Sequence, residues 1–376
     1  MKNLSPLFLS LCFVLFPGIP AAGQSGKGSP EAAGDSLAAF SDPAGIWGKG
    51  IEGVIEAAYR RCTKTYIIGG KVMNLRMPFA QNNERSLLTD GDWEFLGGGK
   101  ADPPFLWGAI SEIFETEDFR NYVDALGDGR EKVIIFDIPG KTWTPDRNFF
   151  NIARIKAGSY RGLPHRPYVW VSGGGIEETD VYNYLYCVGW AGMDCSGFVW
   201  YILSHIAAEG GLDLGRALRS AMGVPRGGSP SYYAGTKFFN SRNAQIVPVQ
   251  DEIRNLKPAD ILLFRGMEGE MVHSAIIQSV DFSAGIIRYL QCTDEAPPEE
   301  RGVHESAIRF DPARPAVRLS DPSLEWSQKR YPPFPGERAS AFSDDGSRYR
   351  AFPELGGGRV VRLRALTSII NRINRR

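Results

Sequence analysis

The sequence predicts an α+β fold in which one apolar helix packs on an antiparallel sheet. Apolar residues recur at helical spacing over 198–202, and the pattern stops at Gly210, a usual end for a helix. Further along the chain, 261–264, 272–277 and 286–292 are short apolar runs separated by turn-forming and glycine-containing segments. Such runs are typical of neighbouring strands joined as hairpins.

Cys195 is placed at the start of this helix, where a polar loop turns into the apolar segment. Backbone N–H groups without a helical partner and the positive end of the dipole favour an anion there, which lowers the pKa of a thiol. Gly197 in the first turn allows another stretch of backbone to approach closely. For a cysteine without further context, a buried and inert side chain is the alternative interpretation.

A histidine at the start of a predicted strand favours the reactive interpretation. His273 opens the run 272–277 and follows a turn at 256–260 and the strand 261–264. The chain between Cys195 and His273 is long enough for a helix, a connection and a strand, and catalytic Cys–His pairs are adjacent in space rather than in sequence. His273 is therefore placed like the base of a cysteine nucleophile.

These segments resemble the NlpC-type cell-wall cysteine peptidases, a papain-like family. The family pattern is Asp-Cys-Ser-Gly, then a strand led by Pro-Gly-Asp, then a strand led by histidine, and the similarity here covers about 167–292. It implies a papain-like (NlpC-type) catalytic domain in which Cys195 attacks a peptide amide and His273 is its base. One departure is Ala259, where the family usually has glycine; it affects a turn and not the chemistry.

Gln291 is the candidate for the third catalytic residue. Such a residue is polar and hydrogen-bonds the far nitrogen of the imidazole, fixing its tautomer and orientation. Gln291 has the matching position on the strand after His273. Alternation along the strand places Cys292 on the opposite face, as a core residue rather than a second catalytic thiol. If the register is off by one, Gln291 is an ordinary surface residue.

Substrate recognition follows from the resemblance. In the family, a tyrosine that precedes the nucleophile and the Asp and Ser beside the cysteine meet the free amine of the stem peptide, which points here to Tyr168, Asp194 and Ser196. Tyr168 belongs to Pro-Tyr-Val-Trp-Val-Ser-Gly-Gly at 167–174; the aromatic segment 184–189 is the alternative. From the residues alone, Asp194 is equally a helix cap and Ser196 a first-turn residue.

The remaining histidines have weaker claims to the site. His205 lies on the predicted helix but is rotated away from Cys195, so we expect a structural role. His304 follows an acidic loop and is a remote alternative to His273, and His165 precedes the Tyr168 segment, where it could line the cleft. No pair of histidines or cysteines has a close metal-ligand spacing, so we predict no metal and no cofactor.

The start of the chain predicts export. Lys2 precedes the apolar run 7–16, which leads to Ala21-Ala22-Gly23, so 1–23 reads as a secretory signal peptide and implies a periplasmic or cell-wall location. The run is too short to span a membrane. Residues 24–45 are rich in Ser, Gly, Ala and Pro and are predicted to be a flexible leader.

The length without the signal peptide suggests about two domains. We expect an N-terminal α/β region at 46–150 that resembles no family, the peptidase domain at 151–315, and a C-terminal extension at 316–376. Within the first region, 46–61 and 109–126 have helical spacing and 133–136 reads as a strand. This region is either a wall-binding or cleft-shaping domain or an extension packed on the catalytic core.

The basic tail, residues 359–376, interleaves arginines with Val, Leu and Ile and is predicted to be an amphipathic helix. It either contacts anionic lipid or wall polymer or docks on the domain with a solvated basic face. The chain as a whole has 43 basic and 43 acidic residues, which argues against a general nucleic-acid binder. We expect a monomer. If Cys195 is the nucleophile, the other cysteines after the signal, Cys62, Cys187 and Cys292, form at most one disulfide.

Together these observations predict an exported cysteine peptidase that acts on peptidoglycan stem peptides. From the resemblance, the bond cleaved joins D-glutamate, through its γ-carboxyl, to a diamino acid. Two alternatives stay open: an amidase or acyltransferase on the same Cys-His scaffold, and a non-enzymatic wall-binding protein.

Overall fold

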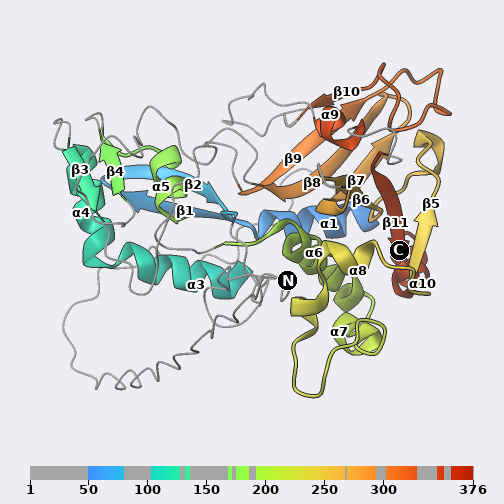
Figure 1. Cartoon of the computed structure of the whole chain (residues 1–376), viewed down its shortest axis with the longest axis horizontal. Helices are drawn as coiled ribbons and strands as arrows, with labels where there is room; N and C mark the ends of the chain where they lie inside the picture. Colours follow the sequence, from blue (N-terminus) through green and yellow to red (C-terminus); the bar gives the residue numbers. More distant parts are fainter. Residues whose placement is uncertain are drawn as a thin grey trace, which may run out of the picture. The chain divides into compact units, whose positions relative to one another are not determined.

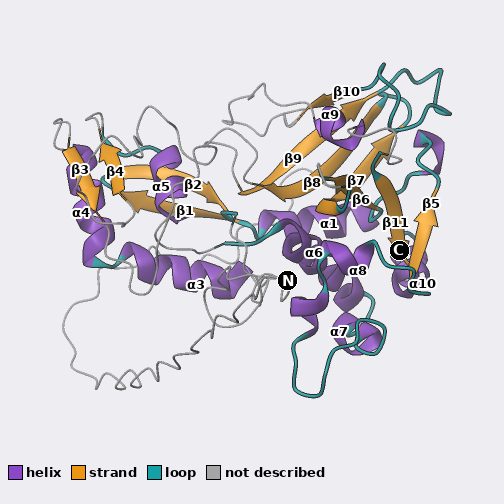
Figure 2. Ribbon diagram, in the orientation of Figure 1, coloured by secondary structure: helices purple, strands orange, loops and turns teal. Residues whose placement is uncertain are grey.

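The computed structural model of the chain is α+β (Figures 1 and 2). It describes residues 50–79, 103–127, 132–135, 168–171, 175–185, 192–266, 269–293, 302–327, 345–350 and 357–375. The predicted signal peptide and leader, and Cys187, lie outside these residues. Among the helices described, none combines the length and the apolar character that a membrane span needs.

A seven-stranded antiparallel sheet carries the centre of the structure, in the strand order β10-β9-β8-β7-β6-β11-β5. Figure 1 shows β8, β9 and β10 side by side. The strands are β5 (Ile246–Val249), β6 (Ile261–Arg265), β7 (Met271–Asp281), β8 (Ile286–Thr293), β9 (Gly302–Arg309), β10 (Glu325–Ser327) and β11 (Arg359–Leu363). The predicted α+β class and the predicted antiparallel strands are therefore confirmed.

Helix α6 (Cys195–Glu209) is the central helix and begins at the cysteine, as predicted. Asp194 caps its first turn and Gly210 ends it. Most of its residues are buried, because the helix packs on β7 and β8 on one side and is covered by other helices elsewhere. Further described helices include α1 (Ile51–Arg60), α7 (Leu214–Leu218), α8 (Thr236–Phe239), α9 (Asp345–Arg350) and α10 (Thr367–Ile373), with short 3₁₀ turns at Pro230–Tyr233, Ile253–Asn255 and Arg364–Leu366.

The sheet side chains alternate between two apolar cores. Ile276 of β7 and Leu290 of β8 pack in the same core as α6. Phe264 of β6 and Tyr289 of β8 lie in a second core with Tyr349 of α9. Since neighbouring strand residues point to opposite faces, the α6 core and the α9 core cover the two sides of one sheet.

The segment 316–376, predicted as a C-terminal extension with a basic tail, contributes two strands to this sheet. Strand β11 lies between β6 and β5, and β10 pairs with β9. The predicted helix over 359–376 is wrong for its first part, because the β-branched Val360 and Val361 are buried in the sheet. The helical part of the tail begins with the 3₁₀ turn Arg364–Leu366 and continues in α10, which docks on the domain through Ile369 and Ile373.

The N-terminal region also reaches across its predicted boundaries. Helix α1 packs on α6 and β7, and strand β3 pairs with β4, which comes after residue 150. The predicted helix 109–126 is two helices, α3 and α4, with a break at Glu115–Thr116. The elements here are β1 (Thr63–Ile68), β2 (Lys71–Arg76), α3 (Pro103–Phe114), α4 (Glu117–Gly127), β3 (Lys132–Ile135), β4 (Tyr168–Val171) and α5 (Glu178–Tyr184).

Candidate active site

Cys195 is the first residue of α6 and is 9% exposed. The side chain of Asp194 accepts hydrogen bonds from the backbone N–H of Gly197 and, at 3.1 Å, from the Ser196 hydroxyl. This cap fixes the backbone on both sides of the thiol. The Sγ atom lies 4.0 Å from the carbonyl oxygen of Val272, so the start of α6 meets the sheet at the start of β7.

The other described cysteines are in different surroundings. Cys62 and Cys292 are fully buried, and neither they nor Cys195 form a disulfide. Burial raises the pKa of the Cys62 thiol, which keeps it protonated and unreactive. Cys292 lies in the α6 core and its thiol donates to the carbonyl oxygen of Met193 at 3.2 Å, which confirms the prediction of a core residue.

His273 follows Val272 on β7 and is 4% exposed. Its ring centroid lies 5.2 Å from that of Phe264, the residue opposite it on β6. Its Nε2 atom lies 2.7 Å from Oε1 of Gln291. An amide oxygen only accepts, so Nε2 is the donor and carries the proton, and Nδ1 is then the basic nitrogen.

The register of three strands explains this contact. Gln291 on β8 faces Ala275 on β7 and His304 on β9. His273 is two residues before Ala275, so its side chain is on the same face as that of Gln291 and is its diagonal neighbour. The hydrogen bond predicted between His273 and the side chain of Gln291 is therefore present, and Gln291 is 1% exposed rather than a surface residue.

The amide nitrogen of Gln291 has partners that the sequence analysis missed. It donates to Asp345 Oδ2 at 2.8 Å and to Ser306 Oγ at 2.9 Å, and it lies 3.3 Å from Nε2 of His304. His304 and Ser306 are two residues apart on β9, so their side chains are on the same face of the strand. This spacing was the one signal in the sequence that could have predicted their proximity. His304 thus lies behind Gln291 and does not occupy the place of His273.

Asp194 and Ser196 flank the cysteine as predicted, but both are buried, at 3% and 1% exposed. The Asp194 carboxylate accepts from the Ser196 hydroxyl and from the Gly197 N–H, and these hydrogen bonds stabilise the helix start. Tyr168 is on β4, where it pairs with Ile135 of β3 in a two-stranded sheet, and its side chain lies outside the part of the structure that is described.

The first residue of the alternative aromatic segment at 184–189 is a buried core residue. Tyr184 is 2% exposed and packs edge-on against Phe119, with ring centroids 4.9 Å apart. Residues 186–189, like His165, lie outside the described residues. His205 is half-buried on α6, and burial, followed by the charge of Arg61, lowers its pKa. This environment agrees with the predicted structural role for His205.

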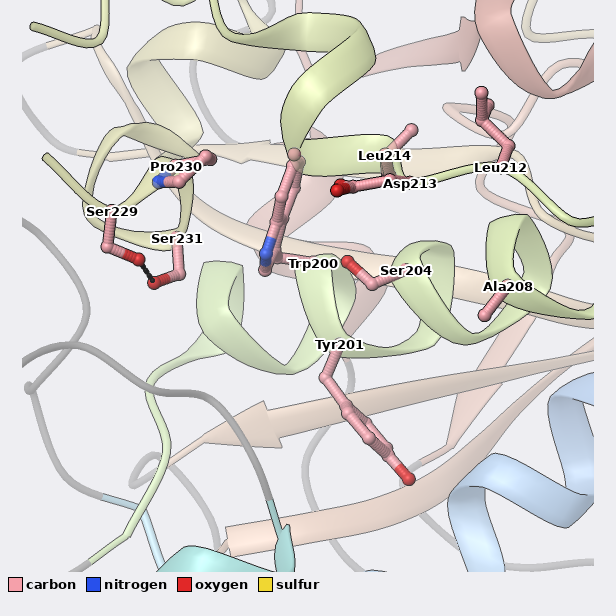
Figure 3. Close-up of a pocket in the computed structure, with 11 residues that line it drawn as sticks. Trp200, Tyr201, Ser204, Ala208, Leu212, Asp213, Leu214, Ser229, Pro230 and Ser231 are labelled. Atoms are coloured by element: carbon pink, nitrogen blue, oxygen red, sulfur yellow. Dashed lines mark hydrogen bonds between the residues drawn. The ribbon is translucent and has the colours of Figure 1, made fainter. Parts of the chain in front are cut away.

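A cavity of about 380 Å³ lies between α6, the start of α7 and the turn at 229–231 (Figure 3). Figure 3 shows the side chains of Trp200 and Ser204 rising from α6 toward Asp213 and Pro230. None of the predicted site residues lines this cavity. Over the described residues, no group of three or more His, Cys, Asp or Glu side chains is arranged to hold a metal ion.

Comparison of the chain with protein-family models, with curated proteins and with solved structures finds no match. The assignment of chemistry therefore depends on two contacts: the one between His273 and Gln291, and the one between Cys195 Sγ and the carbonyl oxygen of Val272, the residue before His273.

Proposed function

We propose that this protein is an exported cysteine peptidase with a papain-like catalytic domain, and that it cleaves an amide bond in peptidoglycan stem peptides. The observation that carries the proposal is the 2.7 Å contact between His273 Nε2 and Gln291 Oε1. It assigns the proton to Nε2 and leaves the basic Nδ1 on a histidine whose neighbour, Val272, touches Cys195.

In the proposed reaction, the Cys195 thiol gives its proton to His273 Nδ1, and the sulfur attacks the carbonyl carbon of the scissile amide. Backbone N–H groups at the start of α6 stabilise the oxyanion. His273 then protonates the leaving amine, and a thioester forms. Water, deprotonated by the same histidine, hydrolyses the thioester and restores the thiol.

Gln291 holds the imidazole in the orientation and tautomer that this sequence of proton transfers needs. Gln291 is on β8, which pairs with the strand that carries His273, and it is 1% exposed. The proposed substrate is the bond from the γ-carboxyl of D-glutamate to a diamino acid, because the segments around Cys195 and His273 resemble the NlpC-type peptidases.

The test is digestion of purified peptidoglycan and of soluble muropeptides, followed by mass spectrometry of the products. We expect a new amine on the diamino acid and a free γ-carboxyl on the glutamate, and no product with a Cys195→Ala variant. Cleavage between muramic acid and the stem peptide would instead identify an amidase. A ligation product formed with an added amine would identify an acyltransferase.

The reactivity of the Cys195 thiol distinguishes a cysteine peptidase from a wall-binding protein without activity. In the native protein, we expect iodoacetamide to alkylate Cys195 faster than Cys62 or Cys292, because both of these are fully buried. Equal and slow labelling of all three, measured by peptide mass spectrometry, would favour a protein without a reactive nucleophile.

A further inference from the structure

Asp345 extends the candidate site from a distant part of the chain. It is the first residue of α9 and is 7% exposed. Two donors converge on its Oδ2 atom: the hydroxyl of Tyr289 at 2.5 Å and the amide nitrogen of Gln291 at 2.8 Å. Convergence of two donors on one oxygen identifies Oδ2 of Asp345 as an acceptor.

The side-chain amide of Gln291 has two orientations that occupy nearly the same space. In the observed one, the oxygen faces His273 and the nitrogen faces Asp345. The flipped one would place the amide oxygen against the carboxylate, where two acceptors repel each other. It would also present an NH₂ group to His273, and the imidazole would then have to carry its proton on Nδ1.

Two further acceptors stand on the Asp345 side of the amide. Ser306 Oγ lies 2.9 Å from the Gln291 nitrogen, and His304 Nε2 lies 3.3 Å from it. His304 Nδ1 lies 2.9 Å from the carbonyl oxygen of Gly302, so Nδ1 donates and Nε2 has the lone pair. Asp345 is the charged member of this group and makes the shortest of these contacts with the Gln291 nitrogen.

We propose that Asp345 is a positioning residue that acts through Gln291: its carboxylate fixes the amide orientation, and this orientation sets the Nε2–H tautomer of His273. The inference extends the proposed function, since it names a residue on α9 that keeps His273 able to accept the Cys195 proton at Nδ1. It also gives the C-terminal segment a role in the site in addition to its role in the sheet.

The first measurement is the tautomer of His273, read from ¹⁵N chemical shifts of the histidine-labelled protein. We expect the Nε2–H form in the native protein and in Asp345→Asn, because the asparagine oxygen can accept both hydrogen bonds. In Asp345→Leu we expect a substantial Nδ1–H population. Ser306→Ala is the matched control: it removes one neutral acceptor and should leave the tautomer unchanged. A native tautomer in Asp345→Leu would overturn the proposal.

The second measurement is the rate of Cys195 alkylation by iodoacetamide as a function of pH. Asp345→Leu should slow the reaction near pH 7 about 10-fold or more, because a wrong tautomer disables the base. Among the described residues, the titratable groups linked to His273 through Gln291 are Tyr289 from β8, His304 from β9 and Asp345 from α9. Neither measurement needs a substrate, so a failure to cleave stem peptides would leave both readable.

If Asp345→Leu does not fold, a pair of substitutions at positions 291 and 345 tests whether Asp345 acts through Gln291. Gln291→Glu places a second carboxylate against Asp345, so one of the two must bind a proton, and the pH profile of alkylation should shift from the native one. Adding Asp345→Asn to Gln291→Glu supplies an NH₂ donor and should restore a profile with a single transition near the native pH. If the double variant behaves like Gln291→Glu alone, Asp345 does not act through residue 291.

Discussion

Arg362 on β11 forms a two-pronged ion pair with Asp260 at the start of β6. Its Nε lies 2.6 Å from Oδ1 and its Nη2 lies 2.7 Å from Oδ2 of a carboxylate that is fully buried. Asp260 also accepts from the backbone N–H of Lys257 at 2.8 Å, which closes the turn that leads into β6. The C-terminal strand is thus fixed to the same hairpin that carries His273.

This pair predicts a large stability effect. Replacing Arg362 by Met leaves a buried carboxylate without its counter-ion, and we expect a loss of about 3–5 kcal/mol in the free energy of unfolding at pH 7. Arg364→Met is the control, because Arg364 is exposed and should change the value by less than about 0.5 kcal/mol. Denaturant titration of both variants measures the difference.

The sign of the pH dependence follows from the same contacts. Burial raises the pKa of Asp260 above its ordinary value, and the hydrogen bond from Arg362 is the main influence that holds the pKa down. Without Arg362 the pKa rises further, so the folded variant binds a proton that the unfolded chain releases. The difference in the free energy of unfolding between Arg362→Met and the native protein should therefore become smaller as pH falls from 7 toward 4. A constant difference would mean that Asp260 does not titrate in the variant.

A second stability prediction concerns Ala259. Its φ is 71°, in the left-handed region where a side chain is strained, and its N–H donates to the Ile277 carbonyl at 2.8 Å. In Ala259→Gly, relief of that strain stabilises the folded state, while loss of the methyl group and the added freedom of the unfolded chain destabilise it. We expect these effects to balance, so the free energy of unfolding should stay within about 0.5 kcal/mol of the native value. Ala207→Gly on α6 is the control and should cost about 1–2 kcal/mol. Similar losses of stability in Ala259→Gly and Ala207→Gly would contradict the proposed backbone strain at Ala259.

The positive φ of Ala259 shows that this turn needs the backbone conformation that glycine adopts most easily.

Local signals accounted for the part of the site that lies on α6, β7 and β8. The cap at Asp194, the helical apolar spacing and the alternation around Gln291 are properties of a few consecutive residues, so they could be read before the fold was known. Asp345 could not be predicted, because its role depends on α9 packing on a sheet that lies dozens of residues earlier in the chain. Arg359–Leu363 was misread for a related reason: pairing with β5 and β6 overrides the helical spacing of that segment.

The catalytic prediction is direct. Cys195→Ala and His273→Ala should each abolish cleavage of stem peptides, because one removes the nucleophile and the other its base. Both should still fold, with a midpoint of denaturant unfolding close to that of the native protein. Gln291→Ala should keep partial activity, with a loss of about 10- to 10³-fold, as expected for an orienting group. His205→Ala is the control away from the site and should retain activity; full activity in His273→Ala would refute the mechanism.

The last prediction separates two roles of Asp194. As a helix cap, it accepts from the Gly197 N–H; as a binding group, its charge would meet the free amine of a stem peptide. Asparagine caps helices about as well as aspartate does but carries no charge. Asp194→Asn should therefore keep the stability of the native protein. On a free Ala-γ-Glu-diamino-acid peptide it should lower kcat/KM by about 10-fold or more, in line with the roughly 1.5–3 kcal/mol of a hydrogen bond to a charged group.

The substrate supplies the matched experiment. Acetylating the N-terminus of the same peptide removes the amine, and the native protein should lose about 10-fold or more in kcat/KM, whereas Asp194→Asn should treat the two peptides nearly alike. That result would mean that the proposed peptidase prefers peptides already released from the glycan, since only these present the amine. Equal rates of the native protein on both peptides would limit Asp194 to capping α6, in keeping with its 3% exposure, and would favour stems still attached to glycan as substrates.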